Sequence, residues 1–257
     1  MNAMTLWMAF VLIPGLAQAE AGTDAPSATA TVGEDYTAVG LRAAAAEFTR
    51  RYAAADYGLP LDAKAAFFEW ALWRYHTTAD DQVYCKVQLP DAAGEPIDHV
   101  RGADSSTWNG ALLAALGYKY AATHDRATLD AIARLLRGLH RFQTATPKPG
   151  YLVRSMCRDP QHAHDHMQRT TSVDGETWYC WDEPAKGTYN QVVAGYAVMM
   201  MLAHDDLPAD VQRMAHDDLT RLVLHVVDHD YHLTRPDGER TKYGDLTPIV
   251  GSIGVPF

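Results

Sequence analysis

Two short stretches of the chain combine carboxylates with aromatic side chains: residues 104–110 read DSSTWNG, and residues 178–183 read WYCWDE. Sugars present apolar C–H faces that stack on aromatic rings, and hydroxyl groups that need polar partners. Hydrolysis of a glycosidic bond ordinarily requires two carboxyl groups, one protonated as a general acid and one ionised as a base or nucleophile. These patterns predict a carbohydrate site whose candidate catalytic residues are Asp104, Asp182 and Glu183.

The residues around these acids are of types that bind sugar faces and hydroxyl groups. Gly110, at the end of the first stretch, would let a second backbone approach closely. Arg154 lies in the same long loop as residues 178–183 and could neutralise an anionic sugar. This would suit a uronate-acting enzyme with Tyr151 or Tyr189 as proton donor. The predicted substrate-binding residues are Trp108, Asn109, Arg154, Trp178, Trp181, Asn190 and Gln191.

Each of these residues also has an ordinary structural interpretation. Asp104, or one of the serines after it, is suited to cap the N-terminus of a helix by accepting backbone N–H bonds. Trp108 could fill the core, and Arg154 could pair with a neighbouring acid. The acids at 182 and 183 could be solvated loop residues. The sequence leaves these alternatives open.

Two histidine-rich stretches, residues 162–166 and 228–232, carry side chains that can bind zinc. The spacing of a helical HExxH zinc site is missing, so we predict no metal site. The sequence also lacks a phosphate-binding loop, a dinucleotide-binding glycine pattern and a GxSxG nucleophile motif. We therefore predict no cofactor.

Apolar residues recur with helical spacing in six segments, which are separated alternately by short and long connections. Two antiparallel helices joined by a short turn place their next connection at the opposite end. The alternation therefore places the long connections, and with them both candidate stretches, on one face. We expect helices over residues 34–55, 61–78, 104–123, 129–142, 192–202 and 211–227. We also expect a strand over 83–87, a strand running into a turn over 231–238, and an irregular connection over 144–187.

The composition excludes some partners. Of the 257 residues, 47% are hydrophobic, which is ample for a core, and the net charge is -10. Proteins bind nucleic acids and anionic membranes through a basic surface, so we expect neither as a partner. A carbohydrate is compatible with this charge.

The N-terminus has the outline of an export signal. An apolar run over residues 6–13 is followed by the small-x-small sequence at 17–19. We predict a signal peptide over 1–19, a flexible leader over 20–33 and one domain over 34–257, in a periplasmic or secreted protein that leaves the membrane once the signal is cleaved. An oxidising compartment favours a disulfide, for which Cys157 and Cys180 are the predicted pair; the alternative is three buried free thiols.

Four sequence patterns resemble uncharacterised exported members of the six-hairpin glycosidase-like superfamily, whose fold is an α/α toroid. They are DxSxWNG at 104–110, YAxTxD at 120–125, LLRGL at 135–139 and PGYLVRS at 149–155. The resemblance implies an all-α fold of antiparallel helical hairpins, with small β-hairpins in the long loops on one face, and it implies carbohydrate handling at the level of fold.

A complete toroid of this kind has about twice as many helices as we predict here. The resemblance is therefore to the N-terminal half, and we expect either a fragment or an open half-toroid. An open half-toroid would expose apolar faces and self-associate.

Together these features predict an exported carbohydrate-active protein. The first interpretation is a glycoside hydrolase that acts on a poly- or oligosaccharide through acids in an aromatic-lined cleft. The alternatives are a non-catalytic toroid that binds glycan or protein, and a polysaccharide lyase that acts on uronates.

Overall fold

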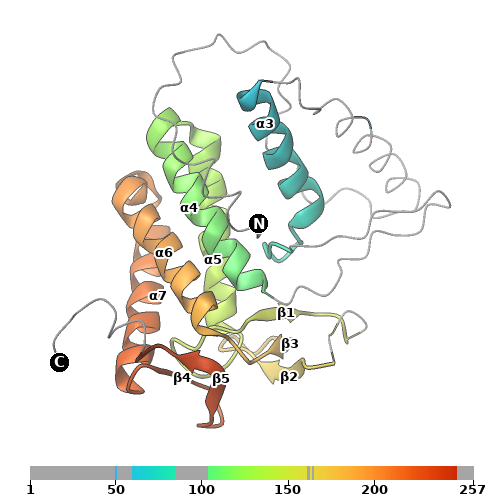
Figure 1. Cartoon of the computed structure of the whole chain (residues 1–257), viewed down its shortest axis with the longest axis vertical. Coiled ribbons are helices and arrows are strands. Elements are labelled where there is room, and N and C mark those ends of the chain that lie inside the picture. The colour runs from blue at the N-terminus through green and yellow to red at the C-terminus, as the bar shows by residue number, and fades with distance from the viewer. Residues whose placement is uncertain (1–49, 51–59, 85–103, 161–162, 164, 248–257) are drawn as a thin grey trace.

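The computed structural model describes residues 50, 60–84, 104–160, 163 and 165–247. This part of the chain is mostly helical, with two small antiparallel sheets (Figure 1). The predicted signal peptide, the leader and nearly all of the predicted helix 34–55 lie outside it. The helical elements are α3 (Leu61–Ala71), the π-helical turn η1 (Leu72–His76), α4 (Ser105–Thr123), α5 (Arg126–Thr144), α6 (Lys186–Leu202), the 3-10 turn η3 (His204–Asp206) and α7 (Ala209–Asp228).

The predictions of α4, α5, α6 and α7 are confirmed, with differences at their ends. Helix α6 begins at Lys186, six residues before the first apolar position of the predicted segment. Helix α5 begins where its cap dictates, because the carboxylate of Asp125 accepts hydrogen bonds from the backbone N–H groups of Ala127 at 3.3 Å and Thr128 at 2.9 Å.

Helices α4 and α6 pack backbone against backbone through two glycines. A Cβ atom on Gly110 of α4 would lie 2.6 Å from the carbonyl oxygen of Gln191, and one on Gly195 of α6 would lie 2.4 Å from the carbonyl oxygen of Gly110. Both distances are too short for any side chain. The prediction that Gly110 lets a second backbone approach closely is confirmed.

The core lies between the helices and the sheets. Helix α5 is amphipathic and contributes fully buried side chains on one face. Helix α6, apolar nearly all round in sequence, is buried on one face only, and its Met201 is 73% exposed. The largest fully buried side chains are Tyr151, Tyr189, Tyr196, Phe142, Leu113, Ile132, Leu135, Leu136, Leu139, Leu152, Met156 and Met199.

The second predicted helix, 61–78, is shorter and less regular than expected. Its α-helical part ends at Ala71, and the π-helical turn η1 carries the chain to His76. The hydroxyl of Thr77 then donates to the carbonyl of Leu72 at 3.1 Å. Thr77 forms an isolated bridge with Val83, the first residue of the predicted strand 83–87, and residues 85–87 of that strand lie outside the described residues.

The connection predicted to be irregular contains a small sheet. Strands β1 (Ser155–Cys157), β2 (Gln168–Thr171) and β3 (Thr177–Trp181) form an antiparallel sheet in the order β1-β3-β2. After α7, strands β4 (His232–Thr234) and β5 (Arg240–Asp245) form a hairpin, in agreement with the predicted strand and turn over 231–238. Figure 1 shows both sheets at the same end of the α4–α7 helices, where the predicted face lies.

The predicted disulfide between Cys157 and Cys180 is wrong: both are free, buried thiols. Cys157 pairs with Tyr179, whereas Cys180 pairs with Met156. Because side chains alternate between the two faces of a strand, this register directs the two thiols to opposite faces of the sheet. No helix in the described part of the chain is long and apolar enough to cross a membrane.

Candidate functional site

The start of α4 is capped by a distant carbonyl and not by the side chain of Asp104. Asp104 occupies the N-cap position, but its side chain makes no capping hydrogen bond to the described residues. Instead, the carbonyl oxygen of Arg154 accepts from the backbone N–H of Ser106 at 3.2 Å and from its hydroxyl at 3.0 Å. The carboxylate of Asp104 is therefore available for a different contact.

That contact is an ion pair with Arg154, whose Nε lies 2.7 Å from Oδ1 of Asp104. The Arg154 guanidinium also lies over the ring of Trp181, 4.5 Å from its centroid, and the Arg154 backbone N–H donates to the Trp181 carbonyl at 2.9 Å. These three residues, Asp104, Arg154 and Trp181, form the Arg154 cluster. The structure thus brings together three residues predicted from sequence to share a site.

The other two predicted acids follow directly on Trp181. Burial raises the pKa of Asp182, and the positive charge of Arg235 offsets part of this effect. The carboxylate of Glu183 is bound by the β4–β5 hairpin: it lies 3.2 Å from Nη1 of Arg235 and accepts from the backbone N–H of Lys242. Asp182 and Glu183 thus differ in environment although they are neighbours in sequence.

Several predicted substrate-binding residues are structural in their placement. The amide of Asn109 is fully buried, and it accepts from Val83 N at 2.7 Å and donates to the carbonyl of Asp81 at 2.7 Å. Trp178 is 2% exposed and belongs to the core, with the Arg158 guanidinium 4.1 Å from its ring centroid. The prediction that Asn109 and Trp178 bind substrate disagrees with this burial.

The remaining predicted binding residues lie near the starts of α4 and α6. Trp108 is partly buried against the core, and its indole N–H has no hydrogen-bond partner among the described residues. Asn190 is exposed and Gln191 partly buried, both early in α6. The hydroxyl groups of Thr107 and Thr188, 3.3 Å apart, join the first turns of α4 and α6, which places these residues at the same end of the fold.

The two tyrosines considered as proton donors are committed to structural hydrogen bonds. The hydroxyl of Tyr151 donates to the carbonyl of Asp182. The hydroxyl of Tyr189 donates to the carbonyl of Gly150 and accepts from Leu152 N, both at 2.9 Å. Burial raises the pKa of both phenols well above the ordinary value.

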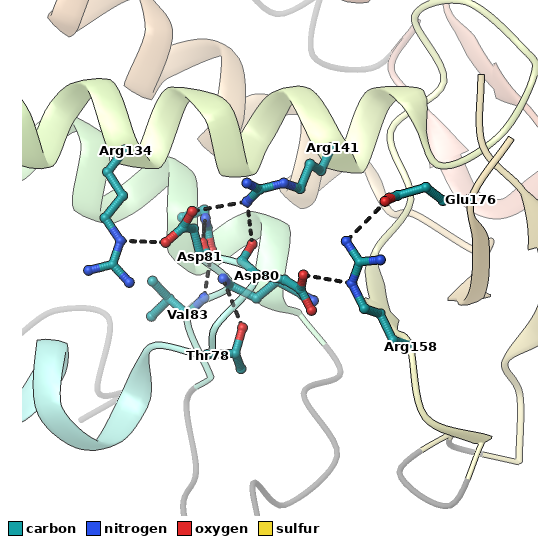
Figure 2. A network of polar contacts seen from close by, with 10 residues as sticks. Thr78, Asp80, Asp81, Val83, Arg134, Arg141, Arg158 and Glu176 are labelled. Carbon is teal, nitrogen blue, oxygen red and sulfur yellow. Dashed lines mark hydrogen bonds and ion pairs between the residues drawn. The ribbon is translucent and has the colours of Figure 1, made fainter. Parts of the chain in front are cut away.

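A charged network that sequence reasoning missed fixes the turn after η1 (Figure 2). The carboxylate of Asp81, a residue with a left-handed φ of 61°, binds Arg134 and Arg141 of α5. Asp80 pairs with Arg158 at 2.9 Å, and Arg158 pairs with Glu176 at 3.2 Å. Positive and negative side chains balance here, so this network stabilises the turn and leaves no surplus charge to bind an ion.

A second missed group joins three helices. The buried carboxylate of Asp218 on α7 binds Nδ1 of His140 on α5 at 2.9 Å and the hydroxyl of Tyr196 on α6 at 3.3 Å. These residues are far apart in sequence. Each is of a type that is common in helices, so none of them stands out in the sequence. The only local sign of this group is that His140 on α5 and Asp218 on α7 are ionisable residues next to apolar positions.

Within the described residues, no group of three or more His, Cys, Asp or Glu side chains could hold a metal ion, the two histidine-rich stretches included. His162 and His164 lie outside the described part. The ring of His166 lies 5.4 Å from that of Trp181, beside the Arg154 cluster.

No protein-family model, curated protein or solved structure matches this chain.

Proposed function

We propose that this protein is an exported carbohydrate-active protein, and that its site lies at the sheet-bearing end of the helices around the Arg154 cluster. One observation carries the proposal: Arg154 contacts both Asp104 and Trp181, which sequence reasoning had assigned to one sugar site from stretches about 70 residues apart. The hydrogen bond from Arg154 N to the carbonyl of Trp181 also brings Asp182 into the neighbourhood, because it is the next residue.

The environments of the acids support a division of roles. A general acid must hold its proton near neutral pH, and burial favours the protonated form of Asp182. Asp104 forms an ion pair with the guanidinium of Arg154, and a carboxylate held in this way is suited to act as base or nucleophile. We assign the first role to Asp182 and the second to Asp104, with Trp181 as the ring on which a sugar stacks.

The fold proposed with this function is part of an α/α toroid. The support is the pairing of antiparallel helices, α4 with α5 and α6 with α7, and the grouping of the strand-bearing connections at one end. The proposed substrate is a neutral poly- or oligosaccharide. A uronate is less well supported, because Asp104 already neutralises the arginine that would bind it.

The test is hydrolysis of a panel of poly- and oligosaccharides by the wild-type protein and by Asp182→Asn. This substitution keeps the backbone carbonyl that Tyr151 binds. We expect the variant to lose about a hundredfold or more in kcat with an unchanged melting temperature. Asp130→Asn is the matched control, because that carboxylate lies on the exposed side of α5 and should not affect turnover. Equal rates for the wild type and Asp182→Asn would contradict the assignment.

A second candidate function is glycan binding without turnover. It is favoured by the ion pairs of Asp104 and Glu183 with Arg154 and Arg235, since carboxylates held in this way are suited to fix an aromatic platform. In that case the panel shows no hydrolysis, yet a glycan binds in calorimetry and Trp181→Ala abolishes the binding heat. Retention of the heat by Trp181→Ala would exclude this platform.

A further inference from the structure

His225, near the end of α7, is an enclosed imidazole that holds the β4–β5 hairpin. It is 4% exposed. Its ring lies 4.5 Å from that of His229, 5.8 Å from that of Tyr151 and 6.1 Å from that of Tyr189. Its Nε2 accepts a hydrogen bond from the backbone N–H of Thr234 in β4 at 3.3 Å. This contact ties the first strand of the hairpin to the helix.

The contact requires a neutral imidazole. A nitrogen that accepts a hydrogen bond from an N–H group carries no proton, so the proton of neutral His225 is on Nδ1. That Nδ1 is buried and has no hydrogen-bond partner among the described residues. Among the described residues, the ring therefore has no hydrogen-bond acceptor that would stabilise a positive charge on it.

Two basic groups near the ring also oppose its protonation. They are His229, the C-cap residue of α7, and Lys148, in the segment before β1; the rings of Tyr151 and of Tyr189 on α6 also lie beside the imidazole. Burial, followed by the charges of His229 and Lys148, lowers the pKa of His225 to about 4.

We propose that His225 is a pH-sensitive anchor, and that a solvent proton taken up at Nε2 releases β4 from α7. Once Nε2 carries a proton, it is a donor that faces the N–H donor of Thr234, and the hydrogen bond between them is lost. A desolvated positive charge would then remain beside His229, so the ring and the strand separate.

The hairpin that His225 holds also contacts the candidate site, and this step rests on the proposed function. Arg235, the residue after Thr234, and the backbone N–H of Lys242 in β5 both bind the Glu183 carboxylate. Release of the hairpin removes both partners from Glu183, and it moves the positive charge of Arg235 away from Asp182. Acid would thereby change the charges around Asp182 and Glu183 through movement of the hairpin.

The experiment measures backbone amide hydrogen exchange of the full chain from pH 6.5 down to about 4, expressed as protection factors for residues 232–245. We expect hairpin protection in the wild type to fall about tenfold or more over this range, while protection of α5 changes little. In His225→Gln the amide oxygen can still accept from Thr234 but does not titrate, so its hairpin protection should stay constant. His216→Gln is the control, because that histidine is an exposed side chain of the same helix.

An equal acid loss in the wild type and in His225→Gln would overturn the proposal, as would constant hairpin protection in the wild type. A second measurement covers the case in which the Gln variant fails to fold. The ring nitrogen shifts of His225 in the labelled wild-type protein should titrate at the same pH at which the hairpin loses protection, and separate midpoints would refute the anchor. Neither measurement uses a glycan, so loss of the proposed function would leave the anchor standing, and the reverse also holds.

Discussion

The imidazole of His140 is hydrogen bonded to a carboxylate of Asp218 from another helix, with Nδ1 2.9 Å from Oδ1. Asp218 is 1% exposed, whereas His140 is half-buried at the surface between α5 and α7. A buried carboxylate without a partner is costly, so His140 and Tyr196 together make the burial of Asp218 tolerable. The same hydrogen bond raises the pKa of His140 above its ordinary value.

This pair predicts a loss of stability toward alkaline pH. A histidine whose pKa is higher in the folded state than in the unfolded state contributes stability that is complete below the unfolded value of 6.5 and is lost as the pH rises through the folded value. The melting temperature should therefore fall as the pH rises above 6.5. In His140→Gln, which does not titrate, this decline should be smaller, and calorimetric melts of both proteins over the same buffers test it. Identical slopes for the two proteins would contradict the role of the pair.

The contact between α4 and α6 predicts intolerance of any side chain at its glycines. In Gly110→Ala or Gly195→Ala the new methyl group meets backbone atoms that cannot move aside, so we expect a loss of about 3 kcal/mol or more in the free energy of unfolding. Gly187→Ala is the matched control: it lies in the first turn of α6 with nothing within 4 Å of its Cβ position, and it should stabilise by about 0.5 kcal/mol. Urea denaturation measures the free energy of unfolding and so distinguishes the expected loss from the expected gain.

Asn109 separates a structural role from a sugar-binding role. Asn109→Ala should leave the buried N–H of Val83 and the carbonyl of Asp81 without partners, at a cost of about 2–4 kcal/mol in the free energy of unfolding. Asn190→Ala, at an exposed position, should change stability by less than about 0.5 kcal/mol. If Asn109→Ala instead kept its stability and lost only glycan binding, the sugar-binding interpretation would be restored.

The Arg154 cluster depends on the planar guanidinium. Arg154→Lys keeps the positive charge and the backbone carbonyl that caps α4, but it cannot both pair with Asp104 through Nε and lie flat over Trp181. We expect a loss of about 1–2 kcal/mol in the free energy of unfolding, together with a change in tryptophan fluorescence. Arg126→Lys, an exposed pair within one helix, should leave both unchanged. Full retention of the fluorescence in Arg154→Lys would count against the stacked geometry.

The helices were the predictable part of this fold, because their apolar spacing is a local property. Small β-hairpins were expected in the long loops, but the positions of these strands were not predicted, since β1, β2 and β3 are three to five residues long and carry few alternating apolar positions. The disulfide prediction failed for a related reason. Spacing along the chain places Cys157 and Cys180 near each other, but only the register of β1 against β3 decides which face each thiol occupies.

The candidate site was predictable in part. The topology of alternating connections was enough to place Asp104, Arg154 and Trp181 at one end of the fold. The role of Asn109 was not accessible, because a buried amide and a sugar-binding amide have the same residue type and differ only in what they face. The partnership of His140 with Asp218 joins residues 78 positions apart, and no local pattern encodes it.

The turn after η1 and the start of α4 are each fastened to the fold by their own contacts. Val83 is bound by Asn109, and Asp81 by Arg141, while Asp104 is bound by Arg154. The turn after η1 is therefore held directly against the start of α4, through the amide of Asn109. In evolutionary terms, a substitution at Asn109 should therefore favour compensating changes in that turn, although Val83 lies 26 positions away in the sequence.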